Sequence, residues 1–172
     1  GDGERRGAIC FPYTNDGSTY SWKLRSIVGK SYSCSGSPST LFGIENTSIG
    51  SDLFIVEGEM DVLAMRMAGY KAVSMPHGAL DKPLSEAGGF SSVQKLKSLG
   101  DANEYIEAAG RVFIALDNDG PGDITSEEIA RRVGKEKCWR VKFGEHKDAN
   151  DALLAEGVAF MQLCVKKAEP WP

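Results

Sequence analysis

Two short apolar runs in this chain each stop at a cluster of acidic residues and glycines. Residues 53–56 read Leu-Phe-Ile-Val and are followed at 57–61 by Glu-Gly-Glu-Met-Asp. Residues 112–116 read Val-Phe-Ile-Ala-Leu and are followed at 117–122 by Asp-Asn-Asp-Gly-Pro-Gly. Each run is typical of a short β-strand. Open α/β sheets place their ligand sites at the carboxyl ends of parallel strands, so the two clusters predict a site at one edge of such a sheet.

The chain around these runs alternates strand and helix patterns, which predicts an α/β fold with a parallel sheet and crossover helices. The predicted strands are 53–56, 72–75, 111–116 and 138–143. The predicted helices are 60–68, 91–99, 103–109, 123–133 and 149–155, with a further helix in the tail. With 172 residues, 41% of them hydrophobic, the chain has room for one packed domain and a small appendage.

The first 45 residues are rich in glycine, serine and threonine and carry β-type stretches. We predict strands at 9–13 and 20–25, because the intervening Asn15-Asp16-Gly17 is a strong hairpin signal. Residues 31–40 predict a mobile loop.

Two basic residues on the second of these strands have i, i+2 spacing. Lys23 and Arg25 should project from one face, with Trp22 and Leu24 facing inward. From the spacing alone, the basic pair is either a solvated strand face or a group that grips phosphate.

Composition excludes several classes of protein. No apolar run approaches the roughly 20 residues that a membrane-spanning helix needs. The four cysteines are far apart and form no C-x-x-C pair, which argues against a zinc site and suits a reducing compartment. The net charge of −4 argues mildly against a dedicated nucleic-acid coat protein, but it leaves room for a local basic groove.

The acidic residues have the spacing of a site for a hard divalent cation such as Mg²⁺. Gly58 after Glu57 lets the backbone approach a ligand closely, and Asp61, one helical turn on, can face the same side. Asp117 and Asp119 point the same way on an extended strand end. Two carboxylates so close repel each other unless a cation lies between them.

Simpler interpretations stand beside this one. Glu57 alone could be a strand-end residue paired with a lysine, and Asp119 begins a run of turn residues. Asp148 follows a third strand and precedes a helix, so it is either a third metal ligand or an ordinary helix N-cap. Glu59 lies off the face of Glu57, and Asp151 belongs on a helix surface.

These motifs resemble the Toprim domain, which primases, topoisomerases and some nucleases share. In that family a glutamate and a glycine follow one strand, here Glu57 and Gly58, and two aspartates one residue apart follow a later strand, here Asp117 and Asp119. A third run, Lys-Asp-Ala-Asn-Asp-Ala-Leu, follows at 147–153. The order of the three motifs along the chain is similar to that in phage-type and organellar, Twinkle-like primase-helicases.

The resemblance implies a Rossmann-like Toprim core within a part of a larger protein. The implied domains are a partial β-rich basic primase subdomain at 1–48, the Toprim catalytic domain at 49–157, and a C-terminal helix, tail or linker at 158–172. G-x-x-x-x-G-K-[ST] is absent, so the helicase motor of a primase-helicase lies outside this chain, as does a cysteine-rich zinc module.

The resemblance also implies a function and roles for residues. The function is DNA primase activity, a metal-dependent nucleotidyl transfer that makes RNA primers on single-stranded DNA from ribonucleoside triphosphates. The implied catalytic residues are Glu57, Asp61, Asp117 and Asp119. The implied ligands of Mg²⁺ or Mn²⁺ are Glu57, Asp117, Asp119 and Asp148. Lys23 and Arg25 are candidates for gripping nucleotide or template phosphates.

The implied partners are single-stranded DNA, ribonucleoside triphosphates, and the helicase domain and zinc-binding module of the larger protein, with no membrane. The implied location is intracellular, in a compartment that contains DNA: a mitochondrion or plastid in a eukaryote, or the host cytoplasm for a phage. Two alternatives stay open. One is a catalytically silent Toprim module that serves DNA binding or scaffolding beside a replicative helicase. The other is a different Toprim activity, as in nucleases and topoisomerases.

Overall fold

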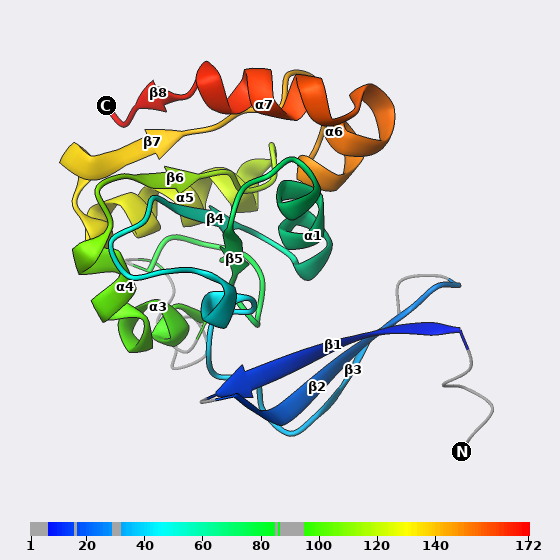
Figure 1. Cartoon of the computed structure of the whole chain (residues 1–172). Coiled ribbons are helices and arrows are strands. Elements are labelled where there is room, and N and C mark those ends of the chain that lie inside the picture. Colours follow the sequence, from blue (N-terminus) through cyan, green and yellow to red (C-terminus); the bar gives the residue numbers. More distant parts are fainter. Residues whose placement is uncertain (1–6, 16, 29–31, 85, 87–94) are drawn as a thin grey trace.

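The computed structural model describes residues 7–15, 17–28, 32–84, 86 and 95–172. Within these residues the strands form two sheets (Figure 1). An antiparallel sheet of order β1-β2-β3 comprises β1 (Ala8–Asn15), β2 (Ser18–Ser26) and β3 (Tyr32–Ser35). A larger sheet of order β5-β4-β6-β7-β8 comprises β4 (Leu53–Val56), β5 (Ala72–Ser74), β6 (Val112–Ile114), β7 (Cys138–Arg140) and β8 (Glu169–Pro170).

The larger sheet is parallel except for β8, which runs antiparallel to β7. The helices connected to it are α1 (Glu59–Met67), α3 (Lys97–Asp101), α4 (Asn103–Ala108), α5 (Gly120–Val133), α6 (Ala149–Glu156) and α7 (Val158–Lys166). Two short 3-10 turns, η1 (Ile44–Asn46) and η2 (Lys135–Lys137), complete the described elements. The predicted α/β class, with a mostly parallel sheet flanked by helices, is confirmed.

Alternating residues of the central strands divide the core into two layers. Leu53 and Ile55 of β4 pack with buried residues of α3, α4 and α5, whereas Phe54 and Val56 pack with those of α1, α6 and α7. Successive side chains of a strand point to opposite faces, so a strand buried on both faces must be apolar throughout. This is why 53–56 is an uninterrupted apolar run.

Helix α5 begins at Gly120, three residues before the predicted start at 123. The side chain of Asp119 caps the helix by accepting a hydrogen bond from Gly122 N at 2.9 Å. Pro121 lies in the first turn, where a fixed φ and a missing N–H are tolerated. The turn signals at 119–122 therefore mark a helix start. Of the predicted helix 91–99, residues 91–94 lie outside the described residues.

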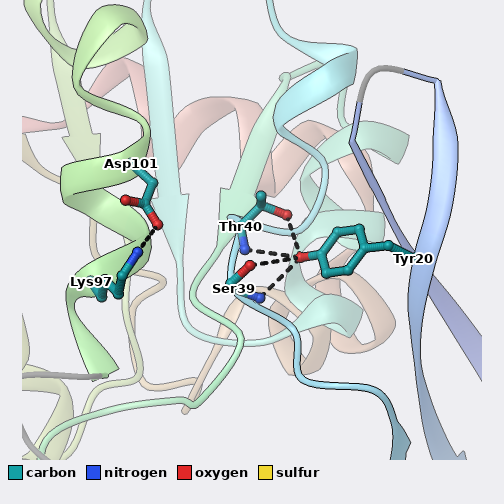
Figure 2. A network of polar contacts seen from close by, with 5 residues as sticks. All are labelled: Tyr20, Ser39, Thr40, Lys97 and Asp101. Atoms are coloured by element: carbon teal, nitrogen blue, oxygen red, sulfur yellow. Dashed lines mark hydrogen bonds and ion pairs between the residues drawn. The ribbon is translucent and has the colours of Figure 1, made fainter.

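The predicted hairpin is confirmed, because β1 and β2 pair with Asn15 opposite Ser18. The loop predicted at 31–40 is wrong in part, since it contains β3, which pairs antiparallel with β2. Tyr20 of β2 ties this sheet to the following segment: its hydroxyl accepts hydrogen bonds from the backbone N–H groups of Ser39 (2.9 Å) and Thr40 (3.1 Å), as Figure 2 shows.

The predicted facing of β2 is also wrong. Phe11 lies opposite Lys23 in the β1–β2 register, and directly opposite residues share a face. Phe11 is buried in the core, so Lys23 also faces inward, while Trp22 is 44% exposed on the other face. The inner face is set by the aromatic residues of the neighbouring strand and not by the hydrophobicity of β2 itself.

The segment 158–172, predicted as a helix, tail or linker, is an integral part of the fold. Met161 and Cys164 of α7 are buried in the core, and β8 adds the last strand to the sheet. Trp171 is buried, and its Nε1 donates a hydrogen bond to Glu127 Oε2 at 3.1 Å. None of the described helices is long and apolar enough to cross a membrane.

Candidate functional site

The two acidic motifs meet at the carboxyl edge of the parallel sheet. Strands β4 and β6 are neighbours in parallel register, with Ile55 opposite Ile114, so Glu57 and Asp117 come from adjacent strand ends. Together with Asp61 they line one open pocket of about 450 Å³. The same pocket is also lined by Asp148, Arg25 and Lys147. The structure therefore brings Glu57, Asp61, Asp117 and Asp148 to one pocket, whereas Asp119 is not among its lining residues.

Glu57 has an oxygen that lacks a hydrogen bond. Its Oε2 is buried and contacts no donor among the described residues. Burial, followed by the charges of Asp117 and Asp119, raises the pKa of Glu57 to about 7, although the charge of Lys147 opposes this shift. A buried oxygen without a donor, beside other carboxylates, is a chemical fit for a hard divalent cation.

Asp117 is buried, and it is paired with a lysine. Lys147 Nζ lies 2.5 Å from Asp117 Oδ2. Burial nevertheless leaves the pKa of Asp117 above its ordinary value. The pair raises the pKa of Lys147 to about 12, chiefly through its hydrogen bond to Asp117. The Lys147 ammonium thus offsets part of the negative charge at the centre of the cluster.

Asp119 and Asp148 both serve as helix caps. Asp119 is the N-cap of α5, and Asp148 is the N-cap of α6, where it accepts a hydrogen bond from Asp151 N at 2.8 Å. The capping interpretation of Asp148 is thus correct as a description of its contacts. Asp119 is close enough to Glu57 and Asp117 for its charge to affect both. Capping uses one carboxylate oxygen in each case, so neither residue is excluded as a metal ligand.

Asp61 is buried and joins two helices. It accepts hydrogen bonds from Gly58 N at 3.2 Å and from Asn150 N at 3.0 Å, which link the start of α1 to α6. Burial and the neighbouring Asp148 raise the pKa of Asp61, while the bond from Asn150 opposes the rise. These two contacts use both carboxylate oxygens of Asp61.

Lys23 is engaged with Glu59 at the junction of the two sheets. Its Nζ lies 2.8 Å from Glu59 Oε1, and the hydroxyl of Tyr13 donates to the same oxygen at 2.6 Å. Arg25, two residues further along β2, lines the acidic pocket. The two basic residues therefore share a face of β2 but have different surroundings.

Among the described residues, no group of three or more histidine, cysteine, aspartate or glutamate side chains has a ready metal-binding arrangement. Asp117 Oδ2 is held by a lysine ammonium, whereas Glu57 Oε2 has no donor among the described residues. A cation at Asp117 Oδ2 would therefore have to replace Lys147. The oxygen-only donor set suits Mg²⁺ or Mn²⁺ better than a softer metal.

Comparison with known proteins bears on this geometry. The Toprim domain family matches residues 51–142, more than half of the chain. The chain belongs to this family. The matched segment contains Glu57, Asp61, Asp117 and Asp119. The acidic motifs indicated a resemblance to the Toprim domain, and this resemblance is confirmed.

Two plant proteins are similar to this Toprim chain over nearly its whole length. It is 41% identical to the Twinkle homolog protein, chloroplastic/mitochondrial, of Arabidopsis thaliana over 95% of this chain and 24% of that protein. It is 39% identical to the Primase homolog protein of Arabidopsis thaliana over 95% of this chain and 51% of that protein. The chain thus spans about a quarter and about half of the lengths of these two relatives.

A solved structure shows the same fold. The primase fragment of the bacteriophage T7 primase-helicase protein superposes with a TM-score of 0.74 at 24% identity, over 91% of this chain and 62% of that one. The region that shares this fold is longer than the segment 51–142 that matches the Toprim family.

Three residues with central contacts were not assigned a site role from the sequence: Tyr13, Glu59 and Lys147. Lys147 lies in the motif at 147–153, but a lysine in a loop is most often solvated, and its pairing with Asp117 spans 30 positions. Tyr13 lies 46 positions from Glu59. Pairings over such separations leave no local spacing pattern.

The close packing of the α5 start against Asp117 gives a first prediction. A Cβ at Gly122 would lie 2.1 Å from the carbonyl oxygen of Asp117, whereas one at Gly120 would meet nothing within 4 Å. We expect Gly122→Ala to destabilise the protein by about 1–3 kcal/mol, as overpacking does, and to displace Asp117. Gly120→Ala is the matched control, and chemical denaturation compares the two. Equal stability of both variants would contradict the packing described here.

The raised pKa of Glu57 gives a second prediction, for metal-free protein. Its folded pKa of about 7 exceeds the ordinary 4.5, so the folded state holds more protons between these values. Stability should therefore fall as pH rises from about 4.5 to 7, by an amount of order 1–3 kcal/mol. Denaturation midpoints in EDTA across this range test the slope. The pH dependence that Glu57 contributes should be missing in Glu57→Gln. If the stabilities of parent and variant change in parallel with pH, the raised pKa of Glu57 is refuted.

Proposed function

We propose that this chain is the catalytic Toprim part of a DNA primase, acting in metal-dependent nucleotidyl transfer. The observation that carries the proposal is the meeting of Glu57 and Asp117 at adjacent strand ends, with a buried, unbonded oxygen on Glu57. The similarity to the Primase homolog and Twinkle homolog proteins supports the same chemistry.

In this proposal the acids hold one or more divalent cations. Glu57, Asp117, Asp119 and Asp148 are the proposed ligands of Mg²⁺ or Mn²⁺, and Asp61 supports them through its bonds to Gly58 and Asn150. When bound, the cations stabilise the charge that develops on the attacking and leaving oxygens of an in-line displacement. The burial of Asp117 and of the Glu57 Oε2 atom keeps these carboxylates in place for this task.

Basic side chains at the same pocket provide contacts for phosphate. Arg25 and Lys147 line it alongside the acids, so both are positioned to bind triphosphate or template phosphates. Lys23, the other candidate on β2, contacts Glu59 and the Pro76 carbonyl oxygen at 3.2 Å. These contacts attach β2 to α1, whereas Arg25 lines the acidic pocket and is the candidate for phosphate that we test here.

The partners proposed for the site are single-stranded DNA as template and ribonucleoside triphosphates as substrates. A helicase domain and a zinc-binding module in a longer protein are proposed as well. The chloroplastic/mitochondrial relative supports a plastid or mitochondrial location.

A second candidate function is a catalytically silent Toprim module that binds DNA or serves as a scaffold. The Lys147–Asp117 pair favours it, because the lysine occupies a carboxylate oxygen that a metal ion would need. The test is primer synthesis by the full-length protein on single-stranded DNA with labelled ribonucleotides and Mg²⁺ or Mn²⁺. Short RNA products that require both template and metal support the primase. DNA binding without any RNA product would favour the silent module.

Arg25 provides a third prediction. We expect Arg25→Ala to weaken binding of nucleotide and single-stranded DNA across sequences and to reduce the salt dependence of binding by about one phosphate contact. Chemical denaturation of the variant checks that it remains folded. Fluorescence anisotropy at several salt concentrations measures the effect. Arg132→Ala, which removes a cation paired with Glu128 on α5, is the control. If both variants bind like the parent at low salt, Arg25 makes no phosphate contact.

A further inference from the structure

Lys147 contacts the acidic cluster at its most constrained point. Its Nζ is 2.5 Å from Oδ2 of Asp117, and the Asp117 side chain is only 8% exposed. The lysine charge also acts on Glu57, where it favours the ionised carboxylate. One ammonium therefore offsets the mutual repulsion of two carboxylates from adjacent strand ends.

A divalent cation at these carboxylates would compete with that ammonium. Asp117 Oδ2 is already bonded to Lys147. Two cations that share one carboxylate repel each other strongly at distances of a few ångströms. Binding of Mg²⁺ or Mn²⁺ by Asp117 therefore requires the lysine side chain to move away.

The loop that carries Lys147 allows this movement. The lysine side chain is 57% exposed, so its stem is in contact with solvent. Its backbone is held separately, because the Lys147 carbonyl accepts a hydrogen bond from Asn118 N at 2.7 Å. The next residue, Asp148, is fixed as the N-cap of α6. The ammonium can thus leave Asp117 without any change in the course of the backbone.

We propose that Lys147 is a built-in counter-ion, which holds Asp117 and Glu57 together in the absence of metal and is displaced when a divalent cation binds. This inference rests on the metal site of the proposed function. It assigns Lys147 a regulatory role at that site: the lysine lowers the affinity for the cation and stabilises the metal-free protein. Metal would then be bound firmly only when a further ligand, such as a triphosphate, adds to its coordination.

Mn²⁺ binding measured by water-proton relaxation tests this role. Lys147→Met keeps most of the length of the side chain and removes its charge. Lys142→Met is the matched control. The Nζ of Lys142 lies 3.5 Å from Asn118 Oδ1, which is an amide oxygen and not a carboxylate oxygen. Each variant changes the net charge from −4 to −5 by the loss of one lysine. We expect Lys147→Met to bind Mn²⁺ about tenfold more tightly than the parent, and Lys142→Met within about twofold.

Thermal unfolding gives a second readout. In EDTA, Lys147→Met should unfold at a lower temperature than the parent, because the carboxylates lose their counter-ion. Added Mn²⁺ should raise its unfolding temperature by more than it raises that of the parent. Lys147→Arg, which keeps the charge, should behave like the parent in both measurements.

The outcomes separate the two proposals. If the parent binds Mn²⁺ and Lys147→Met binds it equally or more weakly, the counter-ion role is wrong and the metal site stands. If neither the parent nor Lys147→Met binds Mn²⁺, the metal site of the proposed function fails, and the counter-ion role fails with it.

Discussion

Replacement of Asp117 and Asp119 by asparagine is expected to lower primer synthesis by the full-length protein roughly a hundredfold or more, a size typical of lost electrostatic stabilisation in group transfer. Asparagine keeps the shape of each side chain and removes the negative charge that would hold the cation. The fold should survive, because asparagine caps a helix about as well as the aspartate at the start of α5.

The control for this double variant is Asp123→Asn. Asp123 lies in the first turn of the same helix, but it pairs with Arg140 and is not among the residues that line the acidic pocket. Primer synthesis by the control should stay close to that of the parent. Parent-level synthesis by the Asp117/Asp119 variant would show that these carboxylates take no part in the reaction.

The largest expected effect on stability comes from Glu59. This residue is 4% exposed, and its Oε1 accepts hydrogen bonds from both Tyr13 and Lys23, which join β1 and β2 to α1. Glu59→Ala removes the acceptor and leaves the Lys23 charge half-buried without its carboxylate. The breaking of a buried pair costs about 3–5 kcal/mol, and the partial exposure of Lys23 places the expected loss at about 2–3 kcal/mol.

Chemical denaturation measures this loss against an exposed ion pair. Asp101→Ala removes the partner of Lys97 on α3, an exposed pair at 2.6 Å that Figure 2 shows. It should change the free energy of unfolding by less than about 1 kcal/mol. If Glu59→Ala and Asp101→Ala have the same midpoint, the contact between the hairpin and α1 contributes little to stability.

The parallel sheet could be predicted from the sequence because its strands are buried on both faces. A strand such as β4 must be apolar throughout, and it ends where the first carboxylate, Glu57, appears. The site followed from the same logic, since adjacent parallel strands end at one edge. Local sequence could not show that Asp117 pairs with Lys147 or that Asp61 bonds to Asn150, since both contacts connect distant segments.

The facing of β2 was predicted wrongly, and strand β8 in the tail was not predicted, both for identifiable reasons. The hydrophobicity of Trp22 favoured an inward position, but Phe11 and Tyr13 on β1 fill the inner face, and Glu59 accepts a bond from Lys23 there. Strand β8 has only two residues, including Pro170, and so carries no strand pattern. Proline is tolerated in such a strand at the edge of a sheet.

The central claim is that the carboxyl edge of this sheet binds a divalent cation through Glu57, Asp117 and Asp119. It is tested most directly by titration of this chain with Mn²⁺, monitored by water-proton relaxation, with Mg²⁺ as competitor. Our account predicts weak, Mg²⁺-competable binding by the parent, with water completing the coordination shell, and loss of that binding in the Asp117→Asn/Asp119→Asn variant. Mn²⁺ binding that is unchanged in the variant would contradict it.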